Sequence, residues 1–360
     1  MNPLLIAATE EGSGKTAIAL ALGSIAKDRS HTVGYMKPKG THLGSRAGKA
    51  LDEDPLFARK LLELPDEIRD LEPIVYSETF AKQSIRTYND VDELHRTVQE
   101  SYEDLASDRD LMFLEGGSRF TVGGIIRLTD PDIADLLDAR VVLVAPYTSV
   151  FDLDEVVGPV DQFNDRLVGV LFNIVGDVHF DHVVNDVVPY LRTRNVPVLG
   201  VLPHTKVMAG VTITDLAKEL GADMLTHDAT RDAFVERFLV GAMGSETALH
   251  YFRMTKDAAI ITGGDRSDLQ TTALRASGIK CLILTGGYRP SSMVIGQAEQ
   301  RNIPILLVST DTRTTIDRVG SMIPGRTRDE RTVNRTRTLL EEYADLETIL
   351  GVDSDEKVDK

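Results

Sequence analysis

The chain has 360 residues, of which 42% are hydrophobic and 27% are charged, an ordinary balance for a protein with a folded core. This length exceeds one average domain and is sufficient for two, each with its own core. The 56 acidic residues outnumber the 40 basic ones, and the resulting net charge of -16 argues against a general role in binding DNA or RNA.

The first apolar run, residues 3–8, is followed directly by Glu10 and Glu11, which is too early for a signal peptide. No run in the chain approaches the length of a transmembrane helix. We therefore expect a cytoplasmic protein without a membrane partner.

Short apolar, β-rich runs alternate with helical patterns in the first half of the chain. The runs are residues 4–8, 32–36, 111–114, 141–144, 167–174 and 196–202. This alternation predicts an α/β fold with a mostly parallel sheet covered by helices. The charged stretch 52–108 predicts helices and insertions beyond the edge of that sheet.

A second series of strands follows, at residues 258–261, 281–284 and 303–308. It predicts a second, smaller α/β domain. We assign residues 1–215 to a P-loop domain, 216–325 to the second domain, and 326–360 to a polar helix with a C-terminal tail. Cys281 lies inside an apolar run, so we expect a buried thiol that forms no disulfide.

A glycine-containing turn joins the first apolar run to an alanine-rich helical segment. Glycines let backbone N–H groups close around phosphate oxygens, Lys15 can neutralise the terminal phosphates, and Thr16 offers a hydroxyl to Mg²⁺. The usual P-loop spacing would place a glycine at Thr9, so the motif is imperfect, and the alternative is that Gly14 and Lys15 only cap a helix. The candidate nucleotide-binding residues are Glu11, Gly12, Ser13, Gly14, Lys15, Thr16 and Ala17.

Two further polar segments close strands of the same domain. Lys37 follows the second strand, and Glu115, followed by two glycines, closes the third. Ligands bind at the carboxyl ends of strands in open α/β sheets, and Mg²⁺ prefers carboxylate oxygens. These segments therefore predict a magnesium and substrate site, with a plain strand-ending turn as the alternative at Glu115.

A strand ending in Thr-Gly-Gly-x-Arg occurs twice in the second half, at residues 262–266 and 285–289. Parallel neighbouring strands would bring both turns to one edge of the sheet, where a small-ligand pocket could form. The arginines could bind phosphate, or Asp265 and Arg266 could pair merely to fix the loop. The candidate ligand residues of this domain are Gly264, Asp265, Arg266, Gly286, Gly287 and Arg289.

Two other patterns have simpler explanations. His179 and His182 have a spacing that two metal ligands can use, but no third ligand is evident, so a surface pair is preferred over a zinc site. The arginine-rich stretch 326–337 could bind an acidic partner, although a solvated helix with internal ion pairs is the commoner outcome.

The P-loop, Lys37 and Glu115 segments together resemble dethiobiotin synthetase and the related cobyrinic acid diamide synthetases, over about residues 1–210. This resemblance implies ATP and Mg²⁺ as cofactors and carboxylate activation as the chemistry. It implies Lys15 and Lys37 as catalytic residues, Thr16, Asp54 and Glu115 as magnesium ligands, and Asn173 as the residue that reads adenine.

The second half resembles the DRTGG domain, although the naming motif has become Asp-Arg-Ser-Asp-Leu at residues 265–269. The pairing of the two domains resembles the N-terminal regulatory half of long phosphotransacetylases. Those enzymes carry a further catalytic domain, which this chain is too short to contain, so we expect no acetyl transfer by this polypeptide alone.

Two functions follow from these patterns. The first is a nucleotide-responsive regulator of a metabolic enzyme, in which the DRTGG-like domain senses a second ligand or mediates assembly into a dimer or higher oligomer. The alternative is an ATP-dependent ligase that activates a carboxylate as an acyl phosphate, or a weak ATPase.

Overall fold

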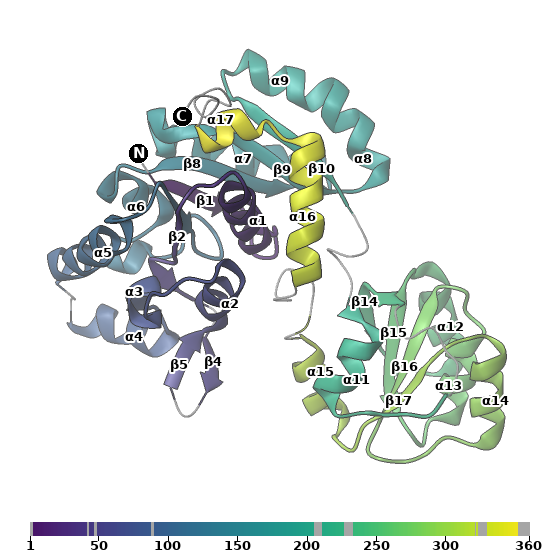
Figure 1. Cartoon of the computed structure of the whole chain (residues 1–360). Helices are drawn as coiled ribbons and strands as arrows, with labels where there is room; N and C mark the ends of the chain where they lie inside the picture. Colours follow the sequence, from purple (N-terminus) through teal and green to yellow (C-terminus); the bar gives the residue numbers. More distant parts are fainter. Residues whose placement is uncertain are drawn as a thin grey trace. The chain divides into compact units, whose positions relative to one another are not determined.

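The computed structural model describes residues 3–41, 43–46, 49–87, 90–204, 211–226, 233–320, 322 and 330–351. The chain forms two compact units (Figure 1). The first contains residues 1–204 together with 328–360, and the second contains residues 205–327.

The first unit is built on a six-stranded sheet in which every neighbouring pair is parallel. The strand order is β10-β9-β8-β1-β7-β2. The strands are β1 (Leu4–Ala8), β2 (Val33–Met36), β7 (Leu111–Glu115), β8 (Arg140–Pro146), β9 (Leu167–Val175) and β10 (Val198–Pro203). Their apolar side chains are mostly buried, as a parallel sheet covered on both faces requires.

Helices connect these strands and cover the sheet (Figure 1). They are α1 (Lys15–Asp28), α2 (Glu53–Leu62), α3 (Ile68–Leu71), α4 (Glu78–Thr87), α5 (Val91–Ala106), α6 (Asp130–Leu136), α7 (Asp154–Phe163), α8 (Asp177–His182) and α9 (Val188–Thr193). Small strand pairs lie outside the main sheet: β3 (Lys39–Gly40) with β6 (Ile74–Val75), and β4 (Leu43–Arg46) with β5 (Lys49–Asp52).

The predicted α/β fold is confirmed, and all six predicted strands of the first half occur within two residues of their expected ends. The stretch 52–108 contains α2 to α5, as its charge pattern predicted. Strand β1 lies in the middle of the sheet, with β7 on one side and β8 on the other. The strand order reverses there, and such a switch point is where open parallel sheets bind ligands.

The helix predicted after residue 325 is α16 (Glu330–Tyr343), followed by α17 (Leu346–Leu350). Helix α16 packs against α1 and β10 of the first unit. Arg337 forms ion pairs with Asp28 of α1 and with Glu341 of its own helix. The sequence did not indicate this return to the first unit, and residues 352–360 of the predicted tail lie outside the described residues.

The second unit has a five-stranded sheet in the order β12-β17-β16-β15-β14. Strands β14 (Arg237–Val240), β15 (Ala258–Gly263), β16 (Ile279–Thr285) and β17 (Ile305–Leu307) are parallel, and β12 (Asp223–Met224) is antiparallel to β17. Two short strands, β11 (Val211–Thr212) and β13 (Phe234–Val235), form a separate antiparallel pair.

Among the described residues of the second unit, five helices enclose two apolar cores, one on each face of its sheet. Helices α12 (Ser245–Met254), α13 (Ser267–Leu274) and α14 (Ser292–Gln300) contribute to one core, and α11 (Ile213–Leu220) and α15 (Thr312–Gly320) to the other. Cys281 lies in the second core, where burial raises the pKa of its thiol, so the prediction of a buried thiol is confirmed. No helix among the described residues is long and apolar enough to cross a membrane.

Candidate nucleotide site at the carboxyl edge of the first sheet

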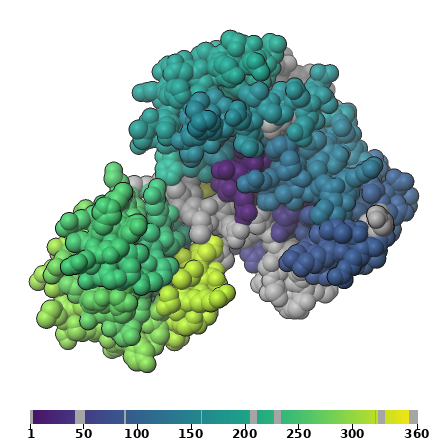
Figure 2. All heavy atoms as spheres, turned by 180° about the vertical axis from the view of Figure 1, so that it is seen from behind, coloured from purple at the N-terminus to yellow at the C-terminus, as the bar shows by residue number. Residues whose placement is uncertain are grey.

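The loop between β1 and α1 has the backbone conformation that its glycines allow. Gly12 and Gly14 have φ values of 82° and 86°, a left-handed region that residues with a Cβ rarely adopt. Glu10 and Glu11 are exposed, whereas Ser13 is buried. In the space-filling view, N-terminal residues coloured purple reach the surface of the first unit between blue and teal segments (Figure 2).

Lys15 begins α1 directly after this loop and is only 6% exposed. Burial lowers the pKa of Lys15 below its ordinary value, although the nearby carboxylate of Glu115 acts in the opposite direction. An anion beside this ammonium would stabilise its charged form.

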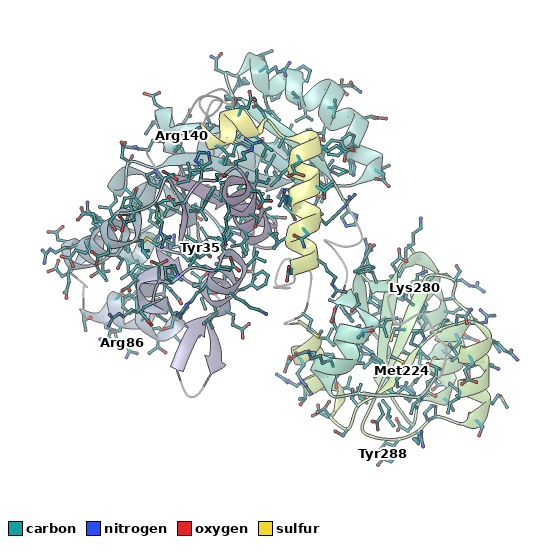
Figure 3. All side chains as sticks on the ribbon, viewed as in Figure 1. Tyr35, Arg86, Arg140, Met224, Lys280 and Tyr288 are labelled. Atoms are coloured by element: carbon teal, nitrogen blue, oxygen red, sulfur yellow. The ribbon has the colours of Figure 1, made fainter. Side chains whose placement is uncertain are left out.

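Glu115, at the end of β7, joins α1 to β2. Its Oε1 accepts a hydrogen bond from the Thr16 hydroxyl at 2.7 Å, and its Oε2 accepts one from the Tyr35 hydroxyl at 2.7 Å. Burial and the charge of Glu115 raise the pKa of Tyr35 well above its usual value, so Tyr35 remains a donor. Tyr35 lies within the side chains of the first unit (Figure 3).

Lys37 follows β2 and lies among three carboxylates. Its Nζ is 2.7 Å from Asp52 Oδ2 and 3.4 Å from Glu115 Oε1, and it also pairs with Asp54. Lys37 is 1% exposed, and burial alone would lower the pKa of its ammonium. The carboxylates of Glu115, Asp54 and Asp52 outweigh burial and raise the pKa of Lys37 above its ordinary value.

Asp52 is both a partner of Lys37 and the N-cap of α2, where its Oδ1 accepts the Asp54 N–H at 3.0 Å. Its own backbone N–H donates to Glu72 Oε2 at 3.3 Å. Glu72 packs so closely on Gly40 that a Cβ there would lie 1.6 Å from Glu72 Oε1. This Oε1 is buried and has no hydrogen-bond partner in the described structure.

Replacing Glu72 with glutamine is expected to stabilise the protein at pH 8 and to have little effect near pH 4. Burial and the charge of Asp52 raise the pKa of Glu72 from 4.5 to about 7. The folded state therefore binds this proton more tightly than the unfolded state, and the wild type loses stability as the pH rises from about 4.5 to about 7. Glutamine stays neutral, so its advantage should reach about 2 to 3 kcal/mol at pH 8.

Urea unfolding of the wild type and Glu72→Gln at both pH values measures this difference. Glu63→Gln is a suitable control, because the carboxylate of Glu63 is exposed and pairs with Lys27 at the surface. Equal effects of Glu72→Gln at pH 4 and pH 8 would contradict the prediction.

Asn173 comes from β9 and contacts the glycine loop. Its Nδ2 donates to the Ser13 carbonyl at 2.8 Å, and its side chain is completely buried. Asn173 Oδ1 and Ser13 Oγ are both buried without a hydrogen-bond partner in the described structure. The role of Asn173 in reading adenine stays a prediction.

A second buried ion pair lies beyond Lys37. Lys39 Nζ is 2.7 Å from Asp130 Oδ1, which also accepts the Gly117 N–H at 2.9 Å. Asp130 Oδ2 packs against Gly116, where a Cβ would lie 2.2 Å away. The two glycines after Glu115 therefore make room for this ion pair, a role that the sequence pattern did not suggest.

The residues at this edge suit a magnesium ion. Three carboxylates, of Asp52, Asp54 and Glu115, face two ammonium groups, of Lys15 and Lys37, which leaves an excess of negative charge. Within the described ranges, no three His, Cys, Asp or Glu side chains form a ready metal cage. Mg²⁺ commonly takes only one or two protein carboxylates and completes its shell with water and phosphate oxygens, so this donor set fits.

The predicted ligand residues of the second unit lie at the carboxyl ends of β15 and β16. The backbone N–H groups of three of their glycines form hydrogen bonds within the protein. The N–H groups of Gly264, Gly286 and Gly287 donate to the carbonyls of Thr285, Thr310 and Val308. A Cβ at Gly264 would lie 2.0 Å from the Tyr288 carbonyl oxygen, so this glycine lets the two turns pack together. Tyr288 is exposed and lies at the opposite end of β16 from Lys280 (Figure 3).

Arg266, in the first of the two turns, also forms hydrogen bonds within the protein. Arg266 binds Asp268 through two hydrogen bonds of 3.0 Å and donates to the Met243 carbonyl at 3.2 Å. The carboxylate partner of Arg266 is thus Asp268, whereas one alternative drawn from the sequence paired Arg266 with Asp265. The ligand-binding role of Asp265, Arg266 and Arg289 stays a prediction.

The histidine pair is arranged around an aromatic ring. His179 and His182 both lie about 6 Å from the ring of Tyr147, and His182 Nδ1 is 2.8 Å from Asp186. No zinc-type group occurs in the part of the chain that the structure describes.

A cavity of about 470 Å³ lies away from these residues, at the amino ends of β8 and β9. Its wall includes Arg166, which pairs with Asp135 and Asp138, and Arg140, which donates to the Thr348 carbonyl. Its arginines are thus both engaged by protein groups, whereas the buried lysines and the glycine loop lie at the carboxyl edge.

Comparison with known families agrees with this arrangement. A family model described as an AAA domain matches residues 2–212, which is more than half of the chain. The chain belongs to this family. A second model, the DRTGG domain, matches residues 215–322.

Curated relatives match in two different ways. The phosphate acetyltransferases of Pseudomonas putida and Nitratidesulfovibrio vulgaris are each 24% identical, over 89% and 96% of this chain and 47% and 50% of their own length. The ATP-dependent dethiobiotin synthetase BioD of Frankia casuarinae is 33% identical over 41% of this chain and 57% of its own. The chain thus spans about half the length of the phosphate acetyltransferases that it matches.

The AAA-family chain therefore combines a BioD-like P-loop domain with a DRTGG domain, as the sequence resemblance predicted. The structure brings together Lys15, Thr16, Lys37, Asp54 and Glu115 from four segments. Sequence analysis missed Asp52, Tyr35 and Glu72. Tyr35 could have been predicted from the sequence, because residues 35 and 37 lie on the same face of an extended segment.

Proposed function

We propose that the first unit binds ATP with Mg²⁺ and that its occupancy regulates a metabolic enzyme, with the DRTGG domain sensing a second ligand or mediating assembly. The observation that carries this proposal is the group formed by the buried Lys15, Lys37 and Glu115 with the half-buried Thr16, beside a glycine loop at the switch point of the sheet.

The unpaired atoms of the loop support a ligand at this position. Among the described residues, Ser13 Oγ and Asn173 Oδ1 are buried polar atoms without a hydrogen-bond partner, and burial lowers the pKa of Lys15. Such atoms are rare in folded proteins and are costly unless something satisfies them. A triphosphate would accept hydrogen bonds from Ser13 and would favour the charged form of Lys15.

Magnesium would be held by Thr16, Asp54 and Glu115. Bound there, it would neutralise the carboxylates and the phosphates, which otherwise repel each other. The Thr16 hydroxyl and Glu115 already lie within hydrogen-bonding distance, and Tyr35 fixes the orientation of Glu115 from the other side.

The arrangement of Lys37 favours regulation over ligation. An ammonium has three donor hydrogens, and Lys37 lies against the three carboxylates of Asp52, Asp54 and Glu115. A carboxylate substrate would have to displace one of them from a site with excess negative charge. Binding of the triphosphate at the glycine loop and Lys15 requires no such exchange, and the proposed Mg²⁺ would share Asp54 and Glu115 with Lys37.

Replacing Lys15 with alanine is expected to weaken ATP binding at least 100-fold, because the variant removes the ammonium at the start of α1, beside the loop. Calorimetric titration with Mg-ATP measures this loss. Lys27→Ala, at the other end of the same helix and partly exposed, is the matched control and should bind as the wild type does. Equal affinities of the wild type and Lys15→Ala would refute binding at this loop.

Regulation is tested separately by light scattering and partner capture with and without Mg-ATP. We expect nucleotide to change either the oligomeric state or the recovery of a metabolic enzyme from lysate, with Lys15→Ala insensitive in both assays. If neither measurement responds to nucleotide although ATP binds, the regulatory part of the proposal fails.

The alternative is an ATP-dependent ligase, favoured by the 33% identity to a dethiobiotin synthetase over the P-loop domain. In that case a carboxylate or carbamate would attack the γ-phosphate, with Lys15 and Lys37 stabilising the developing charge. ADP release stimulated by one substrate in a panel of carboxylates and amines, and abolished by Lys37→Ala, would favour this reaction over regulation.

A further inference from the structure

We infer that Tyr35 determines which metal ion accompanies the nucleotide, because its hydroxyl occupies one carboxylate oxygen of Glu115 and leaves only the other for a cation. The site would then select Mg²⁺, which binds single oxygens, over Ca²⁺, which readily takes both oxygens of one carboxylate. This inference rests on the proposed binding of nucleotide and magnesium. It goes beyond that proposal, since it gives the site a metal specificity and names the residue that sets it.

The pairing of two strands places Tyr35 beside Glu115. Tyr35 lies on β2 directly opposite Phe113 of β7, and Glu115 is two residues beyond Phe113 on the same strand. Opposite residues, and residues two apart on one strand, share a face of the sheet. Tyr35 and Glu115 therefore lie on the same face. Tyr35 has no exposed surface and lies among the side chains of the first unit (Figure 3).

The two oxygens of Glu115 have different partners. Oε2 accepts a hydrogen bond from the Tyr35 hydroxyl at 2.7 Å. Oε1 accepts one from the Thr16 hydroxyl at 2.7 Å and lies 3.4 Å from Lys37 Nζ. A hydrogen bond to an ionised carboxylate is stronger than one between neutral groups. Tyr35 therefore competes with any cation for Oε2, whereas it does not compete for Oε1.

The spacing of the remaining oxygens also suits the smaller ion. Mg²⁺ binds oxygens at about 2.0 to 2.1 Å in an octahedron, which places neighbouring ligand oxygens about 2.8 to 3.0 Å apart. With Ca²⁺, at about 2.3 to 2.6 Å, the same neighbours of an octahedron would lie about 3.3 to 3.7 Å apart. The Thr16 hydroxyl oxygen is 2.7 Å from Glu115 Oε1. This pair would therefore accept Mg²⁺ with little movement, whereas Ca²⁺ would force the two oxygens apart.

Calorimetric titration of the full chain with Mg-ATP, with Ca-ATP and with ATP in EDTA tests this inference. The wild type should bind Mg-ATP at least about ten times more tightly than Ca-ATP. Tyr35→Phe keeps the ring and removes the hydroxyl, so Oε2 becomes available to Ca²⁺. The preference for Mg-ATP over Ca-ATP should then fall by about tenfold, the effect of one hydrogen bond to a charged group. The affinity for metal-free ATP should not change.

The alternative is that Tyr35 is an ordinary core residue whose hydroxyl only needs an acceptor. Equal losses of all three affinities in Tyr35→Phe would favour that alternative and overturn the inference, as would an unchanged preference for Mg-ATP. Tyr102→Phe is the matched control, because Tyr102 is a half-buried residue of α5 and is not a hydrogen-bond partner of Glu115. Its preference should equal that of the wild type.

The wild type alone decides if Tyr35→Phe does not fold. A preference for Mg-ATP supports the inference, whereas equal affinities for Mg-ATP and Ca-ATP overturn it and leave the proposed nucleotide binding intact. A wild type that binds ATP in none of the three forms refutes the proposed function, and this inference with it.

Discussion

Replacing Lys37 with methionine is expected to lower the free energy of unfolding by about 3 to 5 kcal/mol. The ammonium of Lys37 lies among the carboxylates of Asp52, Asp54 and Glu115, and all four side chains are less than a tenth exposed. Methionine preserves most of the side-chain volume, so the variant removes the charge and leaves the packing. Several negative charges then remain close together in a site that water hardly reaches, which is costly.

Urea unfolding without divalent ions measures this loss. Lys280→Met is the matched control, because Lys280 is 42% exposed and its pairing with Asp257 at 3.5 Å should contribute no more than about 1 kcal/mol. Asp54→Asn combined with Lys37→Met should recover part of the stability, since it removes one of the repelling charges. If Lys37→Met costs no more than Lys280→Met, the ammonium of Lys37 does not stabilise the fold by offsetting these carboxylates.

Magnesium provides a second test with the same variant. A divalent cation can neutralise the same carboxylates, so millimolar Mg²⁺ should stabilise Lys37→Met more than the wild type, while NaCl of equal ionic strength should not. No greater effect of Mg²⁺ on the variant would argue against a magnesium site among these residues.

The sequence predicted the parallel sheet well because buried parallel strands are short continuous apolar runs, as residues 4–8 and 141–144 illustrate. It missed β14, whose sequence Arg-Phe-Leu-Val at 237–240 is too short and mixed to stand out. It also gave no sign that α16 packs on α1, because the polar composition of that helix does not specify which surface covers its buried residues.

The candidate site was predictable where each residue follows a strand, because parallel strands bring their carboxyl ends to one edge. Lys37 and Glu115 were found in this way, and Lys15 was found through the glycine-containing turn after the first strand. Asp52 and Glu72 were not, because their roles depend on how α2 and α3 fold back on β2, and neither residue belongs to a motif. The hydrogen bond from Asn173 to Ser13 likewise spans segments whose contact no local pattern encodes.

Replacing Gly14 with alanine is expected to destabilise the first unit by more than about 3 kcal/mol, through two separate effects. Alanine at a φ of 86° is strained whatever the space around it. In addition, its Cβ would lie 2.5 Å from Asn173 Nδ2, closer than real contacts allow, so the amide must give up its position on the loop.

Gly12→Ala separates the two effects. Gly12 has nearly the same φ of 82°, but a Cβ there would meet nothing within 4 Å, so this variant should lose only about 1 to 2 kcal/mol from backbone strain. The remaining cost of Gly14→Ala then belongs to the collision with Asn173. In the double variant Gly14→Ala with Asn173→Ala that collision is absent, so its loss should be at least about 1 kcal/mol smaller than the sum of the single losses. Strict additivity in urea unfolding would mean that the amide of Asn173 does not lie over Gly14 in solution.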